Sequence, residues 1–176
     1  TQHALAYAVE RKQGRTPGAC KDDNEAVAII NHPDVRRMLM SMRTMTEAAR
    51  GICYENAVMA DLAHTSGDAE AQAKYDLLTP ISKAFSTDIA NEVAALGVQV
   101  HGGMGFIEET GAAQHVRDAR ILTIYEGTNG IQAIDLVGRK LPLGNGEVVR
   151  AYIGELRETA EMCRQSNHPV LTRVAG

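Results

Sequence analysis

One carboxylate in the sequence stands where it could act as a general base. Glu126 follows the mostly apolar run 121–125 and precedes Gly127, so we expect its side chain at the edge of a buried segment that an approaching group can reach. Partial burial raises the proton affinity of a carboxylate, as a general base working near neutral pH requires. The alternative is that Glu126 favours the macrodipole of a helix that begins near Asn129. Taken alone, the residue pattern favours this alternative.

A glycine-rich turn could bring the backbone close to a ligand. Gly102, Gly103 and Gly105 fall within four residues, directly after a predicted helix. Glycine reaches positive φ and leaves room for another group. The dinucleotide fingerprint GxGxxG is not met, because a helix precedes the turn and Glu108 stands at the third glycine position. The alternative is that these glycines form a helix C-cap followed by a turn. Taken alone, a loop of this kind is more often a C-cap than a ligand site.

The other reactive residue types form no recognisable site pattern. Six histidines are scattered, with no HExxH or ExxH pair, so we expect no metal. Cys20, Cys53 and Cys163 are far apart, which suits reduced thiols and a cytoplasmic protein, with the mitochondrial matrix as an alternative. A net charge of −4 argues against nucleic acid as a partner. No apolar run is long enough to span a membrane.

Helical periodicity dominates the chain, with apolar residues at steps of three or four. Helices are predicted over about 1–13, 33–63, 69–100, 110–118, 129–140 and from 148 onward. We expect a break at Pro17-Gly18, a short β-rich run at 121–125, a linker at 142–146 and a frayed tail from Asn167. The predicted fold class is all-α, an antiparallel helical bundle with a four-helix up-and-down core and short extra helices.

Four short motifs follow one another at specific spacing. They are Glu10-Arg11-Lys12, Gln99-x-His-Gly-Gly-Met-Gly105, Arg117-Asp118-Ala119-Arg120 and Ile124-Tyr-Glu-Gly-Thr128. As a set they resemble the C-terminal helical domain of FAD-dependent acyl-CoA dehydrogenases, over residues 1–141. The run 126–141 is most similar to an extended subfamily with a further C-terminal domain. The resemblance thus implies two domains, 1–141 and the start of an extension at 145–176, within a longer protein.

The resemblance also implies roles for single residues. Glu126 would remove the α-proton of an acyl-CoA thioester while the β-hydrogen leaves as hydride to FAD, and Tyr125 and Gly127 would line the acyl channel. The implied FAD contacts are Arg11, Gln99 and Gly103 toward a neighbouring subunit's cofactor, with Gly102 in the same close-approach turn, and Thr128 beside the cofactor of its own subunit.

Partners are implied in the same way: an acyl-CoA substrate, a homo-dimer or tetramer, and an electron-transfer flavoprotein as acceptor. We expect the chain to be inactive alone, because other domains of the family hold the flavin ring. Two alternatives stay open. One is an acyl-CoA oxidase or related flavoenzyme on the same fold, and the other is a non-catalytic helical oligomerisation module.

Overall fold

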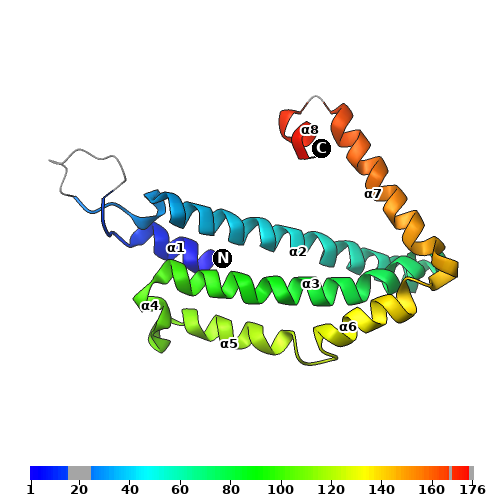
Figure 1. The fold of residues 1–176 in the computed structure, drawn as a ribbon, viewed down its shortest axis with the longest axis horizontal. Helices are drawn as coiled ribbons and strands as arrows, with labels where there is room; N and C mark the ends of the chain where they lie inside the picture. Colours follow the sequence, from blue (N-terminus) through cyan, green and yellow to red (C-terminus); the bar gives the residue numbers. More distant parts are fainter. Residues whose placement is uncertain (16–24, 167, 175–176) are drawn as a thin grey trace. The chain divides into compact units, whose positions relative to one another are not determined.

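The fold is described from a computed structural model that covers residues 1–15, 25–166 and 168–174 (Figure 1). Cys20, the break predicted at Pro17-Gly18, and Asn167 lie outside these residues. In the described part, no helix is long and apolar enough to cross a membrane. Cys53 and Cys163 are free thiols.

The described residues are helical and contain no β-strand, which confirms the all-α prediction. The α-helices are α1 (Gln2–Glu10), α2 (Pro33–Ser66), α3 (Ala69–His101), α4 (Gly103–Phe106), α5 (Ala112–Leu122), α6 (Asn129–Asp135), α7 (Glu147–Gln165) and α8 (Pro169–Val174). Shorter helical segments are Ile29–Asn31, Glu108–Thr110, Leu136–Lys140, which is a π-helix, and Leu143–Gly146.

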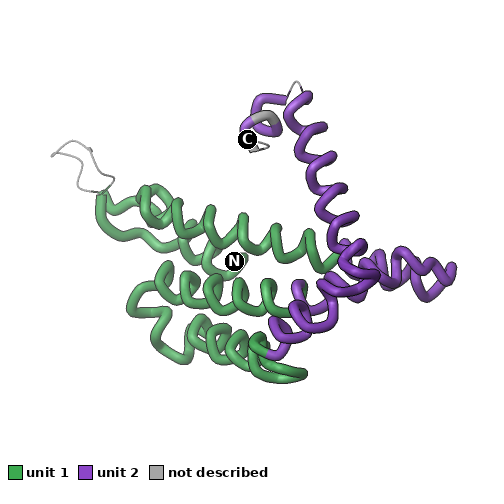
Figure 2. The backbone as a smooth tube through the Cα atoms, turned by 45° about the vertical axis from the view of Figure 1, so that its right-hand side comes forward, with its two compact units in different colours: residues 1–54, 82–130 green, residues 55–81, 131–176 purple. Residues whose placement is uncertain are grey.

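The chain divides into two compact units, which the long helices α2 and α3 both enter (Figure 2). Unit 1 comprises residues 1–54 and 82–130, and unit 2 comprises residues 55–81 and 131–176. In unit 1, the chain runs up and down through α1, the first part of α2, the second part of α3, and α5 (Figure 1). This arrangement confirms the predicted antiparallel bundle with a four-helix core.

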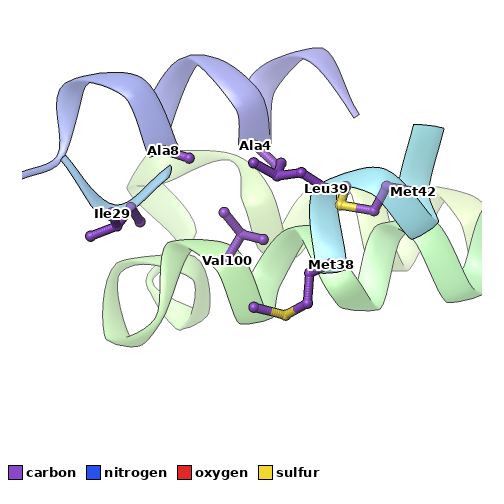
Figure 3. Close-up of a cluster of buried hydrophobic side chains, with 7 residues drawn as sticks. All are labelled: Ala4, Ala8, Ile29, Met38, Leu39, Met42 and Val100. Carbon is purple, nitrogen blue, oxygen red and sulfur yellow. The ribbon is translucent and has the colours of Figure 1, made fainter. Parts of the chain in front are cut away.

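The core of unit 1 is built from alanine, branched aliphatic and methionine side chains. Figure 3 shows the buried cluster, which consists of Ala4, Ala8, Ile29, Met38, Leu39, Met42 and Val100. Alanines on α1 allow this helix to lie close to its neighbours, and the unbranched methionines of α2 fill the space left between helices. This packing fixes the end of α3 from which the glycine-rich turn leaves.

Unit 2 is held together by a charged network. Lys74 of α3 pairs with Glu55 of α2 at 3.1 Å and with Glu155 of α7 at 2.5 Å. The Tyr152 hydroxyl of α7 donates to Glu55 at 3.3 Å, and the ammonium group of Lys74 lies 5.0 Å from the centre of the Tyr152 ring. Asn56, which interrupts the apolar stripe of α2, donates to Thr79 Oγ1 at 3.4 Å. Polar contacts therefore tie α7 to α2 and α3 within this unit.

Some predicted boundaries need correction. The first helix ends at Glu10 rather than Gln13, because Arg11 is extended and its carbonyl accepts the Ile29 N–H at 2.8 Å. The run 121–125 is not β-rich: α5 continues to Leu122, and the Ile124 and Tyr125 N–H groups both donate to the Ile121 carbonyl. The predicted frayed tail contains the short helix α8 instead.

Candidate functional site

The turn that carries Glu126 connects α5 to α6. The Asn129 N–H donates to the Thr123 carbonyl at 3.2 Å, so the residues between them form a closed loop. Thr123 is buried, and its hydroxyl donates to the Arg120 carbonyl in the last turn of α5. Glu126 lies at the middle of this loop, between two fixed ends.

The backbone of Glu126 adopts a left-handed conformation. Its φ is 53°, and the φ of the next residue, Gly127, is 83°. A residue with a Cβ pays for this region with a steric cost of about 1–3 kcal/mol, whereas glycine enters it freely. Such a conformation persists in a folded protein only when surrounding contacts determine it.

Two side chains supply those contacts from the bundle. Lys83 of α3 donates from Nζ to the Gly127 carbonyl at 2.8 Å and to Asn129 Oδ1 at 2.9 Å. The Asn129 amide nitrogen donates to Asp88 Oδ1 at 2.7 Å and to the Ala84 carbonyl at 3.3 Å. The turn is therefore attached to two successive turns of α3.

The sequence did not reveal these anchors as a site. Asn129 was expected only as the start of a helix, and α6 does begin there. Lys83 precedes Gly127 by 44 residues, and none of the four motifs lies near it in the sequence. Only the packing of α3 beside the loop brings them together.

The predicted burial around Glu126 is wrong for the described chain. Glu126 is exposed, and its neighbours Ile124 and Tyr125 are 48% and 46% exposed. Gly127 is half-buried and Thr128 is exposed. After Leu122 the chain forms a turn instead of continuing as a strand. The side chains of this turn therefore face solvent. The general-base and helix-dipole interpretations are both compatible with this position, three residues ahead of α6.

The glycine-rich turn lies at the end of α3. Gly102 has φ 61°, and a Cβ added at Gly102 or Gly103 would meet no heavy atom within 4 Å. Gly105 differs, since a Cβ there would lie 2.4 Å from the Val98 carbonyl oxygen. Packing thus requires Gly105, while Gly102 and Gly103 have open space beside them.

Arg11 and Gln99 lie at the same end of unit 1 as this turn. Both are exposed. Tyr7, one helical turn before Arg11, stacks on His101 at a ring distance of 4.3 Å, which places the end of α1 beside the end of α3. An exposed guanidinium and an unobstructed glycine backbone fit the pyrophosphate of FAD, because phosphate oxygens accept charge-assisted hydrogen bonds and need close approach.

The predicted site residues therefore form two groups. Arg11 follows α1, and Gln99, Gly102 and Gly103 lie at or just after the end of α3, so all four precede α5 in the chain, whereas the turn 125–128 follows the end of α5. The 11 residues of α5 span about 16 Å at 1.5 Å per residue. The two groups of predicted site residues are therefore separated by the length of this helix.

A third feature of unit 1 was not predicted. A pocket of about 540 Å³ is lined mainly by apolar residues of α2, α3 and α5, with His3, His101 and His115 at one side, and none of the predicted site residues lines it. Burial, together with the nearby His101 and His115, lowers the pKa of His3. Within the described ranges, no group of His, Cys, Asp and Glu side chains is arranged to hold a metal ion.

Comparison with known proteins shows which proteins have a similar sequence and fold. The chain is 53% identical to 3-methylmercaptopropionyl-CoA dehydrogenase of Ruegeria pomeroyi over 86% of its own length and 26% of the relative. Its fold matches butyryl-CoA dehydrogenase of Megasphaera elsdenii with a TM-score of 0.62 and 29% identity, over 78% of this chain and 30% of the other. It also matches a chain in the structure of the electron-transferring flavoprotein of Acidaminococcus fermentans, with a TM-score of 0.63, 29% identity and coverage of 77% and 30%.

The chain thus spans about a quarter of the length of the curated relative. Residues 2–141 match the family described as acyl-CoA dehydrogenase, C-terminal domain. This match covers the bundle, the glycine-rich turn and the Glu126 turn alike. The chain belongs to the acyl-CoA dehydrogenase family, and its residues 2–141 match the C-terminal domain of that family.

Proposed function

We propose that this chain supplies the catalytic base of a longer acyl-CoA dehydrogenase, which oxidises an acyl-CoA thioester to its α,β-unsaturated product. The observation that carries the proposal is the backbone of Glu126. A glutamate is held at φ 53°, exposed, on a turn attached to α3 by Lys83 and Asn129. Glutamate does not favour a left-handed backbone, which glycine would adopt without strain.

Glu126 takes the α-proton of the substrate onto its carboxylate. The electron pair of that C–H bond becomes the new π bond as the β-hydrogen departs with its electron pair. Bound FAD would supply the acceptor for this hydride. The developing negative charge on the thioester oxygen needs a preorganised donor, and we assign this role to the backbone N–H of Glu126.

The neighbouring residues complete the site. Tyr125 and Gly127 line the acyl channel, and Thr128 contacts the cofactor of the same subunit. Arg11, Gln99, Gly102 and Gly103 contact the nucleotide half of the cofactor in a neighbouring subunit. The separation of the two groups by the length of α5 supports this division. We assign residues 145–176 to the start of a further helical domain.

A homo-oligomer is part of the proposal. Ile131, Ile134 and Val137 are 53%, 68% and 66% exposed, and they lie on α6 and the π-helical turn that continues it. Apolar side chains clustered at a surface in this way mark an interface. We propose a dimer or tetramer, with an electron-transfer flavoprotein as the electron acceptor, and the resemblance to a chain in such a structure supports the latter.

The test uses the intact flavoenzyme with Glu126→Gln. The variant should bind acyl-CoA, but the loss of flavin absorbance on mixing with substrate under anaerobic conditions should slow by roughly 10²- to 10⁴-fold, the usual contribution of a placed base. Glu158→Gln is the matched control, since Glu158 is an exposed glutamate of α7. Equal rates for Glu126→Gln and the parent enzyme would refute the assignment. Reoxidation by oxygen instead of the flavoprotein would indicate an oxidase.

A further inference from the structure

We propose that Lys83 and Asn129 are positioning residues for the reaction: together they hold the Glu126 turn in its left-handed conformation, so that the carboxylate is presented at a fixed place. This inference rests on the proposed role of Glu126 as base. Neither residue is assigned contact with the substrate or the reacting atoms.

The first step of the argument is the placement of Lys83. Its ammonium group bonds the carbonyl of Gly127, the residue directly after Glu126, at 2.8 Å. That carbonyl belongs to the peptide unit that ends the left-handed pair Glu126-Gly127. Rotating Glu126 to an ordinary backbone conformation would swing this peptide away from Lys83 and break the bond. The lysine therefore favours the strained conformation over the relaxed one.

The second step is the way Asn129 uses both ends of its side chain. Its carbonyl oxygen accepts from Lys83 Nζ, and its amide nitrogen donates to Asp88 and to the Ala84 carbonyl. The amide orientation is thus set by partners of opposite kind at its two ends. Its backbone N–H closes the loop onto Thr123. One residue therefore joins the end of α5, the start of α6 and the side of α3.

The third step concerns rigidity. Lys83 and Asn129 are half-buried, and all their acceptors and donors on α3 lie on a helix that packs into the core of unit 1 through Val100, Val93 and Leu96. A general base acts efficiently only when it is held within hydrogen-bonding reach of its proton. A turn with hydrogen bonds only within itself would sample other conformations. The Glu126 turn is bonded to α3 and is therefore held as rigidly as the bundle.

The proposal is tested in the intact enzyme with Lys83→Met, which keeps the apolar stem but removes the ammonium group. We expect kcat to fall about 10- to 100-fold with KM changed less than threefold, because the base is displaced while substrate binding remains. Hydrogen exchange at the Asn129 amide should speed up at least tenfold. Lys83→Arg, which retains a cationic donor, should recover part of kcat.

Lys140→Met is the matched control, since Lys140 is also a partly buried lysine but pairs with Asp76 in unit 2. It should leave kcat and the exchange of Asn129 unchanged. A second control is the double variant that carries both Lys83→Met and Asn129→Ala. If the two residues act as one unit, the double variant loses little more activity than either single variant.

The outcomes separate this inference from the proposed function. If Glu126→Gln is inactive but Lys83→Met keeps the parental kcat, the positioning role is overturned, whatever the exchange of Asn129 shows. If Glu126→Gln remains active, the proposed function fails, and both proposals fall with it. A lowered kcat with faster Asn129 exchange, in an enzyme that needs Glu126, supports the inference.

Discussion

Within residues 1–15, 25–166 and 168–174, two turns contain a residue other than glycine with a left-handed backbone, and they are specified in different ways. Asn145 has φ 55° and lies between Gly144 and Gly146, which also have positive φ. Asparagine tolerates this region better than other residues with a Cβ, so the sequence around it favours the turn locally. Glu126 has φ 53°, but glutamate has no such tolerance.

The contacts that hold the two turns differ accordingly. The Asn145 carbonyl accepts from Arg150 Nη2 at 2.8 Å, five residues further along the chain. The Glu126 turn is held by Lys83 and by Asn129 bonded to α3, across more than 40 positions. The first turn is encoded by its own residue types, whereas the second is imposed by tertiary contacts on a residue type that does not favour it.

The largest expected effect on the free energy of unfolding comes from removing one of the side chains that hold each turn. Asn129→Ala deletes hydrogen bonds to several partly buried groups of α3 and should lower the free energy of unfolding by about 2–3 kcal/mol. Arg150→Ala removes an exposed side chain and should cost less than about 1 kcal/mol. Urea unfolding of the chain measures both. Similar losses would show that the two turns are anchored alike.

The next effect concerns helix α7, which follows the Asn145 turn and is paired with α3 through Glu155 and Lys74. Lys74→Met should lower the free energy of unfolding by about 1–2 kcal/mol, because it leaves Glu55 and Glu155 without their cation. Arg164→Met is the control, since Arg164 pairs with Glu161 where both side chains are more than half exposed, and it should change the free energy of unfolding little. An equal loss in both variants would contradict the role of Lys74.

The same network predicts a dependence on alkaline pH. Burial lowers the pKa of Lys74, but hydrogen bonds and charge from Glu155 and Glu55 outweigh it and raise the pKa above its usual value. Burial and the charge of Glu55 also raise the pKa of Tyr152. Groups with raised pKa values stabilise the fold fully below their ordinary pKa, and this stabilisation is lost as pH rises through the folded value.

Stability should therefore fall above pH ~10, near the ordinary pKa values of tyrosine and lysine. Ultraviolet absorbance of ionised tyrosine, followed with helical circular dichroism, measures this. In Lys74→Met the loss with pH should be smaller than in the parent, since one of the two titrating groups is gone. An identical pH profile in the two proteins would rule out the network as its source.

Much of this organisation was visible in the sequence. Steps of three and four between apolar residues predicted α2 and α3, because burial of one face fixes that spacing whatever the partner. The motifs carrying Arg11, Gln99 and Glu126 predicted the family, which the comparison confirmed. The start of α6 near Asn129 was also predicted, because a helix start is marked by the residue types directly around it.

What the sequence did not predict depended on contacts between distant residues. The apolar run 121–125 has the composition of a strand, but no strand lies beside it, so its N–H groups bond back to Ile121. The bonds from Lys83 to the Glu126 turn have no local signal. The same holds for the positive φ of Glu126, because nothing in glutamate itself favours it. The residue expected to be catalytic was therefore identified by motif, and its anchoring only by structure.

The smallest expected effect compares glycine substitutions in the two turns. Glu126→Gly should raise the free energy of unfolding by about 0.5–1 kcal/mol, because glycine removes the steric cost of positive φ while losing some chain entropy. Asn145→Gly should change it by only a few tenths of a kcal/mol, as asparagine already tolerates the region. Thermal unfolding of the chain resolves the difference.

The comparison also bears on why a glutamate is there. If Glu126→Gly is more stable while the intact enzyme with the same change has lost its activity, stability and activity are opposed at this one residue, as expected where strain is retained for chemistry. Equal gains at both positions would mean that Glu126 is no more strained than Asn145. The anchoring by Lys83 and Asn129 would then stabilise a turn that needed no help, and the structural argument for Glu126 as base would lose its main support.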